Sequence, residues 1–227
     1  MKISVIIPAL NEAGTLEGAL SSIGGGIEAI VSDGGSIDGT RHIAQRLGAM
    51  LIDSRPGRGA QMDSGAKRAT GDILLFLHAD TKLPKGWDKA VKGAFKDDKV
   101  VAGAFTLSIG SEGMRFRLIE RVAMLRCRAL GLIYGDQAIF ARKESFFKAG
   151  GYDNLPLMED IDCVKRLRRL GRVVILKERA TTSPRRWAKR GAIRNTVRNA
   201  FILSLYFFGA SPQRLYSLYY NNRIKRL

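Results

Sequence analysis

The chain has 227 residues, 45% of them hydrophobic, and a formal net charge of +17 at pH 7. This length predicts one domain, alone or with an extension, and the hydrophobic content is ample for a core. No apolar run approaches the ~18–20 residues of a membrane span, and the run at residues 3–7 is too short for a signal peptide, so we expect a cytoplasmic protein. Two cysteines, Cys127 and Cys163, exclude a disulfide framework or a zinc site.

The positive charge is concentrated in the C-terminal third. Residues 160–227 hold 17 of the 38 Lys and Arg residues but only 3 of the 21 Asp and Glu residues. Such asymmetry predicts a polyanion, an anionic membrane surface or a phosphorylated substrate as partner, or else a merely solvated face. Because the basic residues follow no recognisable nucleic-acid-binding motif with exposed stacking aromatics, we expect no nucleic-acid partner.

The first half of the chain predicts strands that alternate with helices. Short apolar runs bounded by turn residues indicate buried strands at residues 2–7, 27–31, 50–52 and 73–77. Between them, helices are expected at residues 15–23, with Thr15 as cap, and at 40–47 and 60–69. This order is typical of a doubly wound parallel sheet.

The second half continues the α/β pattern less regularly. Helices are expected at residues 87–95, 116–130, 143–149 and 159–170, and strands at 100–109, 137–141 and 173–176. The strand at 100–109 alternates in character, as an edge strand would. We predict a mostly parallel central sheet flanked by helices in residues 1–180. Residues 181–227 are expected to form a basic, partly apolar helical extension.

Polar residues follow two of the predicted strands and mark a candidate ligand site. His78 and Asp80 lie at the carboxyl end of the strand 73–77, where open α/β sheets bind ligands. At i and i+2 of a strand they would point the same way and could share a metal or a phosphate-bound metal. The alternative is a strand followed by a plain surface turn, with Asp80 capping the next element. Asp33 directly follows the strand 27–31, and its carboxylate is placed to accept a hydrogen bond from a nucleotide base.

A third acidic cluster, Glu159, Asp160 and Asp162, begins a predicted helix. Acids there are favoured by the helix dipole in any protein, but one of them is also a candidate general base for an acceptor hydroxyl. Neither a Walker A sequence nor G-x-G-x-x-G occurs, which argues against a P-loop NTPase and a dinucleotide enzyme.

Together these motifs resemble those of family 2 glycosyltransferases with the GT-A fold, over about residues 1–180. Residues 4–12 resemble the opening strand and loop of that family. Residues 31–40 resemble its Asp-Gly-Ser-x-Asp-Gly-Thr signature, with Gly35 extra, and residues 59–81 the stretch that ends in Asp-x-Asp. Residues 150–152, followed by Glu159 and Asp160, resemble its acceptor-side loop and Glu-Asp pair.

The resemblance implies a role for each matching residue. The nucleoside pocket would use Pro8, Glu12 and Asp33, and Arg58 would meet the diphosphate. Asp80 would coordinate Mn²⁺ or Mg²⁺, and Asp160 would be the base of an inverting transfer from a nucleotide-sugar, with UDP favoured over GDP. Glu159, Arg186 and Trp187 would lie on the acceptor side. The implied enzyme is a glycosyltransferase that acts on a hydroxyl acceptor.

His78 departs from the family pattern, because it replaces the first Asp of Asp-x-Asp. An imidazole suits Mn²⁺ better than Mg²⁺ as a ligand, but His78 can equally bind the sugar or a phosphate, or be an ordinary strand-end residue. The departure keeps a second hypothesis open, a nucleotide-sugar-binding protein without turnover. A nucleotidyltransferase is a further alternative, although the Gly-rich loop with Lys that such enzymes carry after the first strand is replaced here by Ala-Leu-Asn-Glu.

The extension contains two further signals. Arg186-Trp187 remains from the Gln-x-x-Arg-Trp motif of processive family members, with Ser183 where Gln would stand, and indicates a closing loop. Residues 200–208 are apolar and aromatic and are flanked by arginines. This pattern is typical of interfacial membrane binding, at the inner face of the membrane, or of a helix packed on the domain or a second subunit. Membrane binding and packing on the domain can both hold if the acceptor is linked to a lipid.

Overall fold

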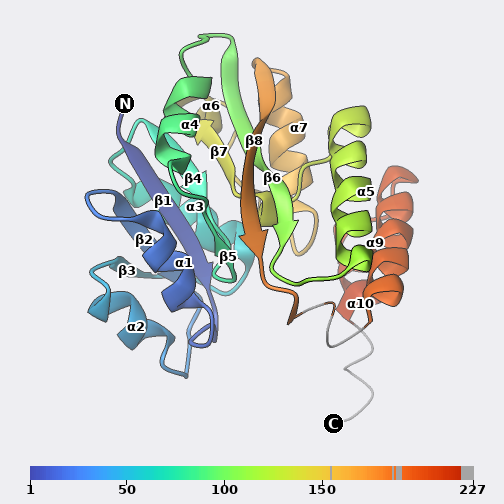
Figure 1. The fold of residues 1–227 in the computed structure, drawn as a ribbon, viewed down its shortest axis with the longest axis horizontal. Coiled ribbons are helices and arrows are strands. Elements are labelled where there is room, and N and C mark those ends of the chain that lie inside the picture. Colours follow the sequence, from blue (N-terminus) through green and yellow to red (C-terminus); the bar gives the residue numbers. More distant parts are fainter. Residues whose placement is uncertain (154, 186, 188–190, 221–227) are drawn as a thin grey trace.

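The computed structural model describes residues 1–153, 155–185, 187 and 191–220, with residues 192–195 described as helix without their side chains. A mixed sheet of eight strands runs through the described chain in the order β3-β2-β1-β4-β7-β6-β8-β5. Helices cover both faces of this sheet (Figure 1). The predicted α/β class is therefore confirmed.

The first four strands form the parallel half that the sequence predicts. They are β1 (Ile3–Ala9), β2 (Glu28–Asp33), β3 (Met50–Asp53) and β4 (Ile73–Phe76), connected by α1 (Leu16–Ile23), α2 (Thr40–Arg46) and α3 (Arg58–Arg68). Strands β3, β2, β1 and β4 pair in parallel. All four carboxyl ends therefore meet at one edge of the sheet, where the loops after β1, β2 and β4 converge.

The second half of the sheet is mixed. Strand β7 (Ile139–Arg142) pairs antiparallel with β4 and with β6 (Val100–Ile109), and β8 (Arg172–Thr182) runs parallel to β6. The expectation that residues 100–109 form an edge strand is wrong, because β8 is much longer than predicted and pairs along β6. A two-residue strand missed by the sequence, β5 (Thr81–Lys82), pairs with the end of β8.

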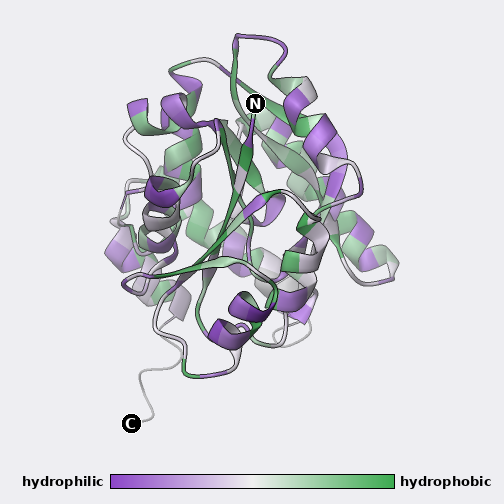
Figure 2. Ribbon diagram, turned by 90° about the vertical axis from the view of Figure 1, so that its left-hand side faces the viewer, coloured by the Kyte–Doolittle hydropathy of each residue, from purple (hydrophilic) through white to green (hydrophobic). Residues whose placement is uncertain are grey.

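Apolar side chains on the two faces of the sheet explain the unbroken hydrophobic strands. In β1, Val5 and Ile7 pack with α1, α2 and α4 (Trp87–Ala94), whereas Ile6 packs with α3, α6 (Lys143–Lys148) and α7 (Glu159–Arg168). Figure 2 shows the hydrophobic colour concentrated on the central strands. Such strands, buried on both faces, are apolar at every position.

The end of β4 is fixed by an aromatic cluster. The Phe76 ring lies 5.0 Å from that of Phe146 and 4.9 Å, edge-on, from that of Tyr152, measured between centroids. Both partners come from the segment that leads to α7. Edge-to-face and tilted pairs at this distance are favourable beyond the area they bury. The cluster therefore holds the start of α7 beside the loop that follows β4.

The C-terminal residues form two helices beside the carboxyl edge of the sheet. Helix α9 (Ala192–Phe207) and helix α10 (Pro212–Tyr220) pack through Ile202 and Leu215 against Leu157, which precedes α7. Helix α9 lies next to α5 (Met114–Leu130) (Figure 1). No helix in the described part of the chain is long and apolar enough to cross a membrane.

Candidate active site

A pocket of about 660 Å³ opens at the carboxyl ends of β1 and β4. Its wall includes six of the residues selected from the sequence: Pro8, Glu12, Arg58, His78, Asp80 and Glu159. Helix α10 contributes Tyr216 and Tyr220 to the same wall. The structure thus gathers residues from four separate segments of the chain around one cavity, and adds a wall from the extension that the sequence did not predict.

Arg185 links two of the three acidic residues of this pocket, Glu12 and Asp80. Its Nη1 and Nη2 lie 2.6 and 2.7 Å from the Glu12 carboxylate, and its Nε donates to Asp80 Oδ2 at 3.1 Å. The Asp80 side chain is only 4% exposed, so its charge is balanced mainly by this guanidinium. Hydrogen bonding to Glu12, together with the charge of Asp80, raises the pKa of Arg185 despite partial burial.

Asp80 is positioned by a turn and not by a strand. Strand β4 ends at Phe76, and Thr81 N–H donates to the His78 carbonyl at 3.0 Å, which closes a turn over residues 78–81. The strand alternation expected for His78 and Asp80 therefore does not apply, although both side chains reach the same pocket. Ser183 N–H donates to the Asp80 carbonyl at 2.9 Å, so the end of β8 fixes this turn and brings Arg185 to it.

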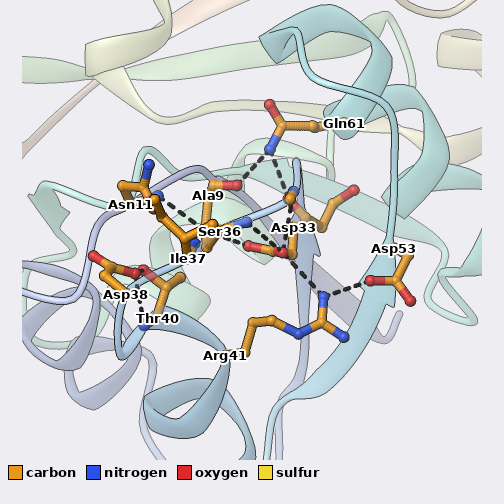
Figure 3. A network of polar contacts seen from close by, with 12 residues as sticks. Ala9, Asn11, Asp33, Ser36, Ile37, Asp38, Thr40, Arg41, Asp53 and Gln61 are labelled. Atoms are coloured by element: carbon orange, nitrogen blue, oxygen red, sulfur yellow. Dashed lines mark hydrogen bonds and ion pairs between the residues drawn. The ribbon is translucent and has the colours of Figure 1, made fainter.

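Asp33 organises its own loop instead of lining the pocket. Its carboxylate accepts hydrogen bonds from Gly35 N–H at 3.2 Å, from Ser36 N–H at 3.0 Å and from Arg41 Nη1 at 3.0 Å, and Arg41 also reaches Asp53 (Figure 3). Burial would raise the pKa of Asp33, but these bonds and the Ser36 hydroxyl hold it below its ordinary value. The carboxylate is therefore ionised and held at the edge of the β2 loop.

Two neighbouring contacts hold the first two loops together. The Gln61 amide on α3 donates to the Ala9 carbonyl at 2.7 Å and to the Ser32 carbonyl at 2.8 Å, at the ends of β1 and β2 (Figure 3). Asp38 accepts from Thr40 N–H at 2.9 Å, but the N-cap position of α2 is occupied by Gly39. Thr15 occupies the N-cap position of α1, as predicted, without any side-chain hydrogen bond to the helix.

A second, narrower pocket of about 100 Å³ lies next to the first. Asp160, Trp187, Tyr134 and Ile202 line it, and Arg58, His78 and Glu159 belong to both pockets. The predicted base and the predicted acceptor-side tryptophan therefore share one cavity. Arg186, the other acceptor-side candidate, lies outside the described residues.

Asp160 is held in place by backbone donors. Gly135 N–H donates to its Oδ2 at 2.7 Å, and Ile161 N–H donates to Oδ1 at 2.9 Å. A Cβ at Gly135 would lie 2.5 Å from His78 Nε2 and 3.4 Å from Asp160 Oδ2. His78 and Asp160 therefore converge on the α-carbon of Gly135, a residue that the sequence did not single out and that has room only for hydrogen.

Arg58 and Glu159 form an ion pair between the two pockets. Arg58 Nε lies 3.5 Å from Glu159 Oε1, and the Glu159 side chain is 5% exposed. The negative charge of Glu159 raises the pKa of Arg58 above its ordinary value. Met158, just before the pair, has φ +68°, an unusual conformation for a residue with a side chain, and such strain is found most often at functional sites.

Asp80 is the residue of this site that best fits a divalent metal. Among the described residues, no group of three or more His, Cys, Asp or Glu side chains is placed to hold one. Asp80 nevertheless carries a buried carboxylate that already faces a cation, the Arg185 guanidinium. Mg²⁺ and Mn²⁺ accept one or two carboxylates with phosphate and water oxygens. Asp80 therefore fits an ion whose other ligands come from a diphosphate.

A comparison with protein families matches residues 4–152 to the model described as glycosyl transferase family 2. The matched segment contains β1 to β4 and five of the six selected pocket residues, all except Glu159. The chain belongs to this family. The sequence resemblance is thereby confirmed, and so is the GT-A type of fold.

Individual relatives of this family 2 chain cover parts of it. A PGL/p-HBAD biosynthesis glycosyltransferase of Mycobacterium tuberculosis is 43% identical over 91 residues, which are 35% of this chain and 36% of that protein. The chain matches less than two fifths of the length of its curated relatives.

Solved structures share the fold. Staphylococcus aureus TarS, in complex with UDP-GlcNAc, superposes with a TM-score of 0.65 at 19% identity over 81% of this chain and 58% of that one. Glucosyl-3-phosphoglycerate synthase of M. tuberculosis, with Mn²⁺ and UDP-glucose, gives 0.56 at 22% identity over 80% and 71%.

Proposed function

We propose that the chain transfers a sugar from a nucleoside diphosphate donor to a hydroxyl acceptor. The observation that carries this proposal is the pair of adjoining pockets. One contains the carboxylate–arginine set expected for a nucleotide-sugar, and the other contains Asp160. The direct test is thermal stabilisation by a panel of UDP-, GDP- and dTDP-sugars with and without Mn²⁺. A shift with none of them contradicts the proposal.

Donor binding is assigned to the larger pocket. Pro8 and Glu12 would border the nucleoside, Asp33 would fix the loop against the base, and Arg58 would contact the diphosphate. Asp80 would hold Mn²⁺ or Mg²⁺, with His78 beside it. When bound, such an ion supplies Lewis-acid stabilisation of the leaving diphosphate. We favour a UDP-sugar over a GDP-sugar, in line with the two structural relatives described above.

Asp160 is proposed as the general base. It would take the proton from the acceptor hydroxyl, whose oxygen bonds to the anomeric carbon as the bond from that carbon to the diphosphate oxygen breaks. A single displacement of this kind inverts the anomeric centre. The two backbone N–H donors at Asp160 fix the direction of the carboxylate, and such positioning is a large part of general-base catalysis.

The acceptor side is assigned to the smaller pocket. Glu159 would orient Arg58, and Trp187 would stack on the acceptor, with Arg186 nearby in the sequence. Leu157 and Ile202 make this wall partly apolar, which favours a lipid-linked acceptor. We further propose residues 1–180 as the catalytic domain and 181–227 as an extension that contacts the membrane; β8 continues across this boundary to Thr182.

The competing hypothesis is a protein that binds the donor without turnover, motivated by His78. Donor binding alone does not separate the two hypotheses, so the panel is followed by an acceptor-independent measurement of donor hydrolysis and by a transfer assay. Binding with neither activity, across lipid-linked and water-soluble acceptors, favours the non-catalytic hypothesis.

A further inference from the structure

Helix α5 (Met114–Leu130) has two apolar faces. One face, formed by Phe116, Ala123 and Cys127, is buried against the rest of the domain. The other consists of Met114, Leu118, Val122 and Leu125, which are 88%, 61%, 51% and 68% exposed. Spacings of four, four and three residues place these four side chains on one stripe, on the side of the helix opposite the buried face. A helix that only covered a domain would have a polar outer face.

Arginines border the exposed stripe on both sides. At 3.6 residues per turn, Arg117, Arg121 and Arg128 lie along one edge of the stripe, and Arg115 and Arg126 along the other. Two of the five also contact the domain: Arg117 pairs with Glu120, and the Arg126 guanidinium lies 3.6 Å from the centroid of the Tyr134 ring. Long arginine side chains at such edges can lay their methylene groups along an apolar surface and keep the charge at its border. The outward half of α5 is thus an apolar strip between two basic edges.

The single acid of α5 points inward. The Glu120 side chain is 5% exposed, accepts from Ile109 N–H at 2.7 Å and forms ion pairs with Arg117 and Arg179. Glu120 therefore adds no negative charge to the outer surface of the helix. Glu120 is part of the wall of a pocket of about 570 Å³. The other charged residues of that wall are Arg117, Arg121, Arg128 and Arg179, and apolar side chains such as Leu125 complete it.

Helix α9 extends this surface. It packs beside α5 (Figure 1) and exposes Val197 and Phe201, at 62% and 55%; Phe208, directly after the helix, is 87% exposed. Val197 and Phe201, four positions apart, share one side of α9. Ile202, which follows Phe201, is buried and lines the pocket of Asp160. Helix α9 therefore lies between an exposed apolar surface and the proposed acceptor pocket.

We propose that the outer face of α5, extended by α9, docks on an anionic lipid bilayer. The apolar stripe enters the boundary between headgroups and acyl chains, and the arginines on its edges meet lipid phosphates, with the arginine-lined pocket as a headgroup site. Amphipathic helices of this composition bind in the plane of the interface. Two copies of this face would repel each other through their arginines, which argues against a symmetric dimer.

The docking surface stands on the charge and exposure of α5 and does not require glycosyl transfer. Its consequence for the acceptor rests on the proposed function: a lipid-linked hydroxyl would enter the smaller pocket from the bilayer side along α9. This surface also differs from the one expected from the sequence, because residues 200–208 supply only part of it and α5 supplies its main stripe.

Vesicle flotation of the full chain tests the proposal. Vesicles of phosphatidylcholine are compared with vesicles that also contain phosphatidylglycerol, at low and high salt. We expect binding only to the anionic vesicles, and weaker binding at high salt because exposed charges are screened. The Leu118→Glu/Leu125→Glu variant is expected to lose at least tenfold in partitioning, and Arg121→Gln/Arg128→Gln about fivefold for each arginine removed.

The matched control is Lys89→Gln/Lys96→Gln, which removes the same charge from exposed positions on and just after α4 and is expected to bind like the unchanged protein. Thermal stabilisation by UDP, measured on every variant, shows whether each is folded and whether donor binding fails separately. Equal flotation of the Leu118/Leu125 variant and the control overturns the proposal. A wild-type protein that floats with neither kind of vesicle also overturns the proposal. If that protein is instead a dimer that the same leucine substitutions dissociate, the face is a protein contact.

Discussion

The contact between Arg185 and Asp80 leads to a prediction about metal affinity. A divalent ion at Asp80 needs the carboxylate oxygens to which Arg185 now donates at 3.1 Å. Ion and guanidinium therefore compete for Asp80 before any donor is bound. We expect the Arg185→Gln variant, which keeps side-chain length and loses the charge, to bind Mn²⁺ more tightly than the unchanged protein in the absence of nucleotide.

The size of the effect follows from the burial of the pair. A hydrogen bond to a charged group contributes about 1.5–3 kcal/mol. The Asp80 side chain is 4% exposed but that of Arg185 is 38% exposed, so solvent screening lowers this value to about 1–2 kcal/mol. Since each ~1.4 kcal/mol is a factor of ten in a dissociation constant, the expected gain in Mn²⁺ affinity is about 5- to 30-fold.

Electron paramagnetic resonance of free Mn²⁺ measures this affinity without any turnover. The control is Arg172→Gln, which removes an arginine from an ion pair with Asp97 outside both pockets and is expected to leave Mn²⁺ binding unchanged. Asp80→Asn is expected to abolish binding in either background. Unchanged or weaker Mn²⁺ binding by Arg185→Gln would refute the competition, and with it the view that Arg185 occupies the place of the ion.

Further predictions address the base, the pocket wall and the nucleotide loop. Asp160→Asn should bind UDP normally and lower the transfer rate by at least about a hundredfold, the lower end of what a general base contributes; donor-bound enzyme that transfers at the normal rate contradicts the assignment. Gly135→Ala should reduce transfer strongly, because its Cβ would meet His78 at 2.5 Å, and an active variant would show that this contact is not essential. The pKa of Asp33 is lowered in the folded state, so the ionised carboxylate stabilises the fold above the ordinary value of 3.8, and this stabilisation is lost as the pH falls through the folded pKa. On acidification, the melting temperature of Asp33→Asn should therefore fall less than that of the unchanged protein. Equal falls in melting temperature would argue against the bonds at Asp33.

The parallel half of the fold could be predicted because its signals are local. Buried strands such as 73–77 are apolar throughout, and their turns carry the glycines and acids that end them. The mixed half could not, because the position of residues 100–109 depends on the length of β8. Residues 177–182 are charged or polar except for Ala180 and give no strand pattern. Residues 179–182 nevertheless pair with β6 and carry the chain to Ser183 and Arg185.

The site was predictable at the residues that match family motifs and not at those brought in by tertiary contacts. Asp80 and Asp160 stand in recognisable motifs and line the two pockets. Arg185 could have been found only from the basic pair that precedes Trp187, and the family motif points to its neighbour Arg186 instead. Gly135 had no signal at all, because its importance lies in the approach of two side chains from distant segments. Pocket residues on α10 were hidden for the same reason.

The central claim is that the pocket between β1 and β4 binds a nucleotide-sugar and presents it to Asp160. Isothermal titration of UDP and UDP-sugars into the full chain with Mn²⁺, repeated on Asp80→Asn and on Arg172→Gln, tests it most directly. We expect saturable binding that Asp80→Asn weakens by at least about tenfold, equivalent to ~1.4 kcal/mol, and that Arg172→Gln leaves intact. Binding that is equally strong in all three proteins, or absent from all three for every nucleotide-sugar of the panel, would contradict the account.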